Sequence, residues 1–434
     1  MSRQRRAFGL VVAGVAALAL AGPAAAQEPG RHNAITDVPG VTVGHKTDRQ
    51  AGTGTTALIM PEGALMGASP SGGAPGNRVT TLLRATFQDS MPTPIYGVML
   101  NGGSIFGLQA ACGVVQYLQE RNLGLPFGGQ TVPLVPGAII FDLGRGRDVA
   151  REGEDDIPKD CSDGYAAAAA ARGGRVQQGS VGAGTGARSG GVKGGLGTAS
   201  AVLPDGTVIG ALVVVNSSGR PYNPDDGCEL NALWSEKDDE FGDARRPPNE
   251  CQQAPPPPTP RDGENTTIGV IATNAPLTAG QVERLSQLGE DGFARAIRPA
   301  HTPGDGDTLY AMSTAENAGQ AREVDTGAFR TIGAEAGDVY TRAITKAILN
   351  ARNTGVAATY CETFPGACSG GEVEDEGAGV VPAAPAASPP AAGGGSGVPV
   401  PLLAVVALLG AAAGVTIRRL PRGRRVRGRV AGEA

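Results

Sequence analysis

The stretch "GENTTIGVIATN", Gly263–Asn274, decides how this chain is interpreted. It follows a proline-rich run at residues 255–260, a composition that is typical of disordered segments rather than ordered cores. Thr267–Thr273 then has the apolar, β-branched character of a buried strand. A leader with the composition of a disordered loop therefore ends abruptly on Asn265-Thr266-Thr267, at the head of a strand. This junction is a candidate site at which the chain is cut.

Apolar patterning around this junction predicts strands and helices that alternate without the regular rhythm of a doubly wound sheet, which favours a layered α/β sandwich over a barrel. Thr278 is the expected N-cap of a helix. Residues 223–264 form a long polar insertion, of the kind that is functional or disordered. The expected strands are Thr55–Met60, Ile95–Met99, Ala138–Phe141, Thr207–Val215, Thr267–Thr273 and Asp307–Ser313, and the expected helices are Phe106–Arg121, Gly164–Arg172, Thr278–Leu288 and Gly333–Ala351.

Both ends of the chain carry expected targeting segments. Residues 1–26 combine arginines, an apolar run and a small-residue cleavage site, which predicts a signal peptide. Residues 370–397 predict a flexible stalk. The uncharged residues 398–417 predict a single-pass transmembrane helix, or alternatively a cleaved sorting tail, and the arginines of 418–434 predict a basic cytoplasmic tail. We therefore expect an exported, cell-surface protein that is anchored by the C-terminal helix, with residues 27–369 as its body.

The charge and the cysteines restrict the partners and the chemistry of this body. The signal peptide and the basic tail hold ten of the 37 basic residues and one of the 42 acidic residues, so residues 27–417 have a net charge near −14, which argues against nucleic acid as a partner. No CxxC pair suggests zinc or thioredoxin chemistry. Local spacing favours two disulfides, whereas a third pairing is a guess that competes with a free, buried Cys112. The expected pairs are Cys228–Cys251, Cys361–Cys368 and, as the guess, Cys112–Cys161.

Histidine is scarce, and this limits the available catalytic bases. His32, His45 and His301 are scattered, and the chain has no HExxH, GxSxG or P-loop motif. A free α-amino group has a pKa of roughly 7.7–8.0, so an N-terminal threonine carries its own base beside its own hydroxyl. Cleavage after Asn265 would create such a residue at Thr266. The alternative is that a threonine pair at a strand start reflects β-propensity alone.

Three further features are candidates for the same chemistry, each with an ordinary structural alternative. Asp305 and Asp307 form an acidic turn that could hold the nucleophile, or a solvated turn. Lys193 lies among glycines that let a ligand approach, although a lone lysine is usually exposed. Asn216 ends the run "ALVVVN", where an amide could donate to an oxyanion or cap a turn. The "GAGTGARSGG" loop at residues 182–191 lacks the GxGxxG spacing, and is equally a close-packed turn or a substrate loop.

Taken together and in order, these motifs resemble the L-aminopeptidase/D-esterase family of self-processing hydrolases, which includes β-peptidyl aminopeptidases and nylon-oligomer hydrolases. The resemblance covers most of the body. Its motifs are "NAITDVPGVTVGH", "GTTALIMPEGA", "GGAPGNR", "NGGSIFGLQAACGVVQYL", "GAGTG", "VKGGLGTAS", "LVVVN", "NTTIGVIATNAPLT" and "DGDTLYAMST".

The resemblance implies a four-layer αββα sandwich that is cut into an α fragment, residues 27–265, and a β fragment, residues 266–369. By motif, Thr266 is the nucleophile after cleavage at Asn265, and Lys193 and Asn216 are polar groups of the active site. Asp305 and Asp307 match the acidic pair of the family. The resemblance implies a homo-oligomer, and we expect no cofactor or metal.

One departure concerns the substrate. The nylon-hydrolase branch has a tyrosine where "AIIFDLG" places Phe141, so substrate identity does not transfer. The expected activity is hydrolysis of amide bonds in small peptides or amino-acid amides. Two alternatives remain, namely a catalytically silent, surface-anchored binding scaffold and an acyltransferase of the ornithine acetyltransferase type.

Overall fold

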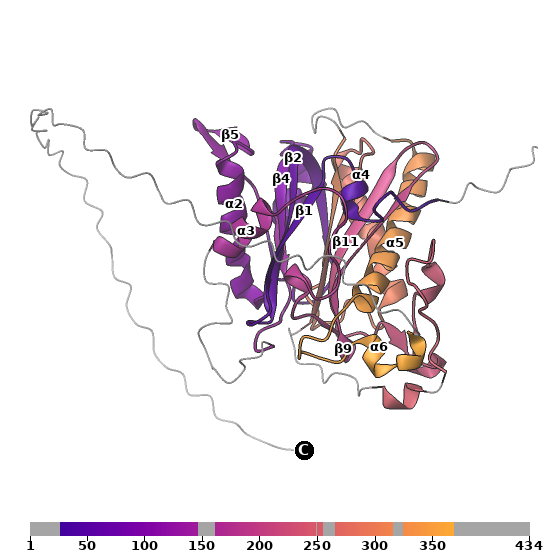
Figure 1. The fold of residues 1–434 in the computed structure, drawn as a ribbon. Helices are drawn as coiled ribbons and strands as arrows, with labels where there is room; N and C mark the ends of the chain where they lie inside the picture. The colour runs from indigo at the N-terminus through magenta and orange to yellow at the C-terminus, as the bar shows by residue number, and fades with distance from the viewer. Residues whose placement is uncertain (1–26, 146–160, 249, 255–264, 316–323, 369–434) are drawn as a thin grey trace, which may run out of the picture. The chain divides into compact units, whose positions relative to one another are not determined.

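The structure is a computed structural model, and it describes residues 27–145, 161–248, 250–254, 265–315 and 324–368 (Figure 1). The predicted signal peptide at 1–26, the stalk at 370–397, the membrane helix at 398–417 and the tail at 418–434 lie outside the described residues.

A long strand, β2 (Thr53–Pro70), joins two halves of one continuous nine-stranded sheet. Its first part pairs with β1 (Thr42–Asp48) and with β4 (Ile95–Asn101), and its last six residues pair with β15 (Thr308–Ser313). The register against β4 shifts between Ile59 and Ala64. The strand order is β10-β11-β14-β15-β2-β4-β7-β3, in which the new members are β10 (Gly195–Val202), β11 (Val208–Asn216), β14 (Thr266–Thr273), β7 (Gly137–Ile139) and β3 (Asn77–Arg78).

Alternating side chains show that the two halves of the sheet face each other. On β11, Leu212 and Val214 belong to a core cluster that also contains residues of β2 and β4, whereas Ala211 and Val213 belong to a cluster with α4 (Ala279–Ala296) and α5 (Thr326–Leu349). Side chains alternate between the faces of a strand, so each half is buried on both faces.

A third cluster covers the outer face of the other half. It joins Ala57, Ile59 and Met99 to α2 (Ala111–Gln119) and α3 (Ser162–Ala169). The layer order is therefore helices, sheet, sheet, helices, with α2 and α3 on one side and α4 and α5 on the other (Figure 1). The predicted α/β class is confirmed.

Short elements complete the described fold. They are α1 (Ala85–Gln88), α6 (Tyr360–Thr363), β5 (Leu125–Phe127), β6 (Gln130–Val132), β8 (Arg188–Ser189), β9 (Val192–Lys193), β12 (Tyr222–Asn223) and β13 (Glu229–Leu230).

The ten predicted strands and helices are all present, with shifted ends. Thr278 caps α4 as expected, accepting from the Gln281 N–H at 3.3 Å, and the helix continues past Leu288 to Ala296. Sequence patterning predicted no strand at β10, because its glycines lower strand propensity. The structure explains them: a Cβ on Gly197 would lie 2.0 Å from the Ala343 carbonyl oxygen of α5.

The polar insertion is more ordered than a loop of its composition suggests. Its described part contains the β12–β13 hairpin and short 3-10 helices, including Leu233–Ser235. The predicted Cys228–Cys251 disulfide closes it, and the Cys361–Cys368 and Cys112–Cys161 pairs are also present. Tyr222 packs edge-on against Phe364, which ties the base of the insertion to the α6 region.

The predicted membrane anchor is not supported. In the described ranges, no helix combines the length and the apolar surface needed to cross a bilayer. The longest, α5, carries charged residues such as Glu335, Asp338 and Arg342. On this finding the prediction of a cell-surface protein held by a C-terminal helix is wrong, and residues 398–417 themselves lie outside the described residues.

The close contact between β10 and α5 gives the first prediction. Gly197→Ala places a methyl group against backbone atoms of α5, which cannot rotate away, and should lower the free energy of unfolding by about 3 kcal/mol. Gly173→Ala is the matched control, since nothing lies within 4 Å of the added Cβ. Urea unfolding monitored by circular dichroism measures both, and equal midpoints for the two variants would contradict the packing described here.

Candidate active site

Thr266 lies at the first position of β14, between two neighbouring strands. β11 pairs with β14 in antiparallel register and places Asn216 directly opposite Thr266. β15 pairs with β14 in parallel, and Asn265 forms an isolated bridge with Asp305 in the turn that leads into β15. Both Thr266 and Asn216 are buried. The register therefore gathers three of the predicted site segments around one peptide bond.

The carbonyl group of Asn265 is held from two sides. The Thr266 hydroxyl donates to the Asn265 carbonyl oxygen at 2.5 Å, and the backbone N–H of Gly306 donates to the same oxygen at 2.9 Å. Position 306 must be glycine, because a Cβ there would lie 2.7 Å from Thr266 Oγ1. A backbone donor on a carbonyl beside a hydroxyl is the arrangement that stabilises an oxyanion during acyl transfer.

Asp305 is buried, but its carboxylate accepts hydrogen bonds from residues other than Thr266. Its oxygens accept from the Ser218 hydroxyl at 2.9 and 3.0 Å, and from the N–H and hydroxyl of Thr302 at 3.0 and 2.6 Å. No hydrogen bond joins the Asp305 and Thr266 side chains in the described part of the chain. Asp305 therefore fixes the turn that carries Gly306 and connects it to the segment that follows Asn216.

Asp307 is buried and is the first member of a chain of polar side chains whose other members are partly buried. Its Oδ1 accepts from the Thr267 N–H at 2.7 Å, and its Oδ2 lies 2.9 Å from Nδ1 of His301. The other imidazole nitrogen lies 3.4 Å from Glu290, which accepts from the Ser71 hydroxyl at 2.8 Å. These contacts connect the backbone of Thr267, the residue after Thr266, to helix α4.

Burial controls the protonation of this chain. It raises the pKa of Asp307, and it raises the pKa of Glu290 to about 7. For His301, burial alone would lower the pKa, but the hydrogen bond to Asp307 and the nearby Glu290 charge outweigh it, so the pKa is raised. Phe293 stacks on the imidazole with ring centroids 4.7 Å apart.

Lys193 is fully buried, contrary to what a lone lysine among glycines usually does. Its amine donates to the carbonyl oxygens of Gly184 at 3.1 Å and Gly194 at 2.6 Å. Burial, assisted by the positive charge of Arg145, lowers its pKa to about 7. Burial raises the pKa of the neighbouring Asp142 to about 6.

The loop at residues 182–191 accordingly serves as a close-packed turn. A Cβ on Gly184 would lie 2.4 Å from the backbone nitrogen of Leu196. Its Gly184 carbonyl holds Lys193, so the turn also contributes to the site.

The amide of Asn216 is oriented by its partners. Its Oδ1 accepts from the Arg188 N–H at 3.0 Å and from Arg145 Nη1 at 2.5 Å, while its Nδ2 donates to the Phe141 carbonyl at 3.3 Å. Two donors on the oxygen fix which end of the amide is nitrogen. These contacts hold the Asn216 amide at the end of β11, at the position that pairs with Thr266.

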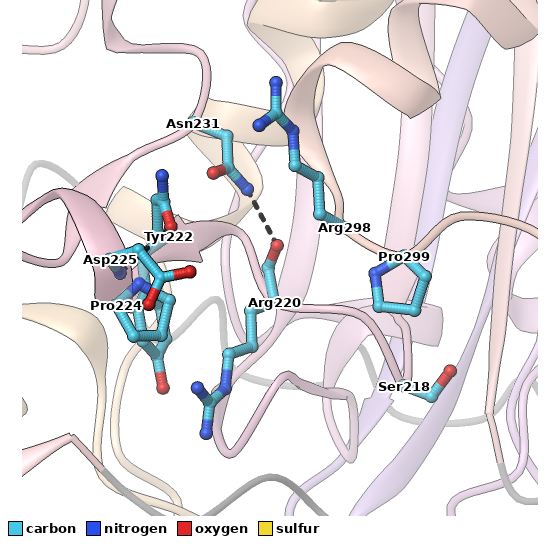
Figure 2. A pocket seen from close by; sticks show the side chains of 9 residues that line it. Ser218, Arg220, Tyr222, Pro224, Asp225, Asn231, Arg298 and Pro299 are labelled. Atoms are coloured by element: carbon cyan, nitrogen blue, oxygen red, sulfur yellow. Dashed lines mark hydrogen bonds between the residues drawn. The ribbon is translucent and has the colours of Figure 1, made fainter.

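A cavity of about 520 Å³ opens beside this constellation (Figure 2). Ser218, the Asp305 partner, forms one wall of it. The remaining walls come from the segment after Ser218 and from the residues that follow the end of α4. The lining residues are Ser218, Arg220, Tyr222, Asn223, Pro224, Asp225, Asn231, Arg298 and Pro299.

Sequence reasoning missed several residues around the site. Gly306 and Ser218 act through backbone position and a short hydroxyl, which carry no distinctive pattern. Arg145, Glu290 and His301 come from distant segments, and only His301 stood near a recognised motif. Among the described residues, no group of three or more His, Cys, Asp or Glu side chains is arranged to hold a metal ion.

Solved structures define the class of fold. A β-aminopeptidase from Burkholderia sp. superposes with a TM-score of 0.57 over 78% of this chain and 93% of that one, at 23% identity. The L-aminopeptidase D-Ala-esterase/amidase from Ochrobactrum anthropi gives a TM-score of 0.56 over 75% and 88%, also at 23% identity, and is described as a variant of the Ntn hydrolase fold. This chain therefore has an Ntn-hydrolase-like fold.

Sequence comparison then gives the family. The profile of peptidase family S58 matches residues 33–360, and the chain belongs to that family. It is 40% identical to an uncharacterized aminopeptidase of Mycobacterium leprae over 77% of this chain and 95% of that protein. It is 31% identical to the 6-aminohexanoate-oligomer endohydrolase of Kocuria sp. over 66% and 76%. The resemblance inferred from the motifs is confirmed, and a hydrolase of the aminopeptidase or amidase class is supported.

Lys193 gives a prediction about stability and pH. Its pKa is about 7 in the folded chain and 10.5 in the unfolded chain, so the unfolded chain binds more protons between these values. Stability should therefore rise with pH across this window. Between pH 7 and pH 9, the unfolding free energy of the protein that keeps Lys193 should rise by about 2 kcal/mol relative to that of the Lys193→Met variant.

Urea unfolding at pH 6, 7, 8 and 9 measures this difference, with both proteins carrying Thr266→Ala so that chain cleavage does not interfere. Lys46→Met serves as the matched control and should show no such trend. A constant difference across the range between the protein that keeps Lys193 and the Lys193→Met variant would contradict the lowered pKa.

Proposed function

We propose that this protein is a self-processing N-terminal-threonine hydrolase that cleaves amide bonds of small peptides or amino-acid amides. The observation that carries the proposal is the Asn265–Thr266 junction. There the Thr266 hydroxyl and the Gly306 N–H both contact the Asn265 carbonyl oxygen. Membership of peptidase family S58 and the aminopeptidase relatives support the reaction class.

The first stage is cleavage of the chain. Thr266 Oγ attacks the Asn265 carbonyl carbon, and the Gly306 N–H stabilises the oxyanion. Because the Thr266 nitrogen is part of the peptide bond, another group must take the hydroxyl proton. Lys193 suits this role, since a neutral amine keeps one lone pair after both of its N–H bonds are donated to Gly184 and Gly194.

The first stage then completes in two steps. The Lys193 ammonium passes the proton it has taken to the Thr266 nitrogen, so that the peptide C–N bond breaks and leaves an ester between Asn265 and Thr266 Oγ. Water hydrolyses this ester, which yields the Asn265 carboxylate and a free Thr266 with its amine and hydroxyl.

The second stage is turnover of substrate. The free amine of Thr266 accepts the proton of its own hydroxyl as Oγ attacks the substrate amide. Asn216, fixed by Arg145 and the Arg188 N–H, donates to the developing oxyanion. Asp307 holds the Thr267 N–H and thereby positions the nucleophile. The leaving amine takes a proton and departs, and water hydrolyses the threonyl ester.

Thr266 variants test both stages. Thr266→Ala should remain a single chain, and its amidase activity should fall by at least about 10⁴-fold, because both the nucleophile and its amine base are lost. Thr266→Ser should still be cut. Denaturing gels and N-terminal sequencing measure processing, and the smaller wild-type fragment should begin Thr-Thr-Ile.

Thr267→Ala is the matched control, and it should be processed at residue 265 as the wild type is. An intact wild-type chain that still hydrolyses amides would overturn the N-terminal-threonine mechanism. An intact chain without activity favours the silent scaffold, and faster transfer to an acyl acceptor than to water favours an acyltransferase.

The base role of Lys193 predicts a pH dependence of processing. The rate of chain cleavage in freshly folded precursor should rise with pH, with a midpoint near 7, as Lys193 loses its proton. Lys193→Met should slow cleavage by about 10²-fold or more, whereas Lys46→Met should not. Time courses on gels between pH 5 and pH 9 measure this, and a pH-independent rate in the wild type would sink the assignment.

A further inference from the structure

Two hydrogen bonds connect the cavity of Figure 2 to the Asn265 carbonyl group. Ser218 lines it and donates to Asp305, and the next residue, Gly306, donates to the Asn265 carbonyl. Ser218 also follows Asn216 by two residues, and Asn216 pairs with Thr266. The cavity is therefore linked to the Asn265–Thr266 junction through Ser218 and the Asp305–Gly306 turn.

Two arginines dominate the walls of this cavity. The backbones of Arg220 and Arg298 are paired by two hydrogen bonds of 2.7 and 3.0 Å. Asn231 donates to the Arg220 carbonyl at 2.8 Å. Figure 2 shows the two side chains leaving this bridged backbone in opposite directions. The bridge fixes the two guanidinium groups at their bases, although they come from segments almost 80 residues apart in the sequence.

The charge of the cavity is positive. The lining residues that are charged near neutral pH are Arg220, Arg298 and one carboxylate, Asp225. Arg298 is exposed, and within the described ranges no side chain pairs with its guanidinium group. Arg220 lies over the Tyr222 ring, 5.6 Å from its centroid, which limits where its guanidinium can go. A planar guanidinium recognises a carboxylate through two parallel hydrogen bonds.

Building on the proposed function, we propose that this cavity is a substrate subsite that selects amides carrying a carboxylate group, with Arg298 as the specificity-determining residue. The volume of about 520 Å³ accommodates a side chain or a terminal residue. Asp225 opposes the carboxylate and moderates its affinity.

The carboxylate belongs either to the acyl part or to the leaving part of the substrate, and two matched pairs distinguish these sources. Glutamyl anilide against glutaminyl anilide tests the acyl part, and alanyl-glycine against alanyl-glycinamide tests the leaving part. In one pair, the mature enzyme should prefer the carboxylate member by about tenfold in kcat/KM, mainly through KM.

Three variants test which charged side chain causes the preference for the carboxylate member. Arg298→Gln should abolish the preference, so that the two members of the pair are hydrolysed with equal kcat/KM. Asp225→Asn should increase the preference. Arg284→Gln, which removes the same charge on α4 outside the cavity, should behave as the wild type. A preference that survives Arg298→Gln, or equal rates within both pairs, would overturn the subsite.

A binding measurement separates the subsite from the proposed function. Titration calorimetry with glutarate and glutaramide requires no turnover, and glutarate should bind about tenfold more tightly than glutaramide to the wild type and equally to Arg298→Gln. Glutarate selectivity without amide hydrolysis supports the subsite and refutes the hydrolase. Amide hydrolysis without glutarate selectivity refutes the subsite and leaves the hydrolase standing.

Discussion

The structure depends above all on the register of β14 between β11 and β15. That register sets Thr266 opposite Asn216 and brings the Asp305–Asp307 turn to the other side of the same residue. The turn then reaches the Asn265 carbonyl through a glycine, whose missing side chain leaves room for the Thr266 hydroxyl. A shift by one residue would turn Thr266 to the opposite face of the sheet and remove it from Asn216.

Burial shifts the pKa values of the ionisable groups around Thr266, and it also makes their charged forms unfavourable. Lys193, Asp142, Asp307 and Glu290 are all removed from water, and each has a pKa shifted toward its neutral form. An isolated buried charge is unfavourable, so each group is held by backbone or side-chain partners. The same desolvation lets the Lys193 amine lose its proton near neutral pH, where an exposed lysine stays protonated.

The polar insertion connects the site to its surroundings. Residues 218–225, where the chain enters the insertion, form walls of the cavity. The Cys228–Cys251 disulfide closes the loop behind them. The Tyr360 hydroxyl donates to the Cys228 carbonyl at 2.9 Å, which holds the insertion against α6. The contacts around Thr266 thus lie on paired strands, whereas the proposed substrate selectivity lies beside them, chiefly on Arg298 in the segment that follows α4. This division lets the two properties vary separately.

The sequence by itself determined the α/β class, the main strands and helices, the Thr278 cap and the family, because periodicity, capping and motif order are local properties. It did not reveal β10, since glycine weakens strand signals and the need for glycine arises only where α5 packs. Nor did it reveal that His301 joins Asp307 to Glu290, or that Arg145 orients Asn216. Only the tertiary structure decided these contacts, because strand register and layer packing bring together residues that no local pattern relates.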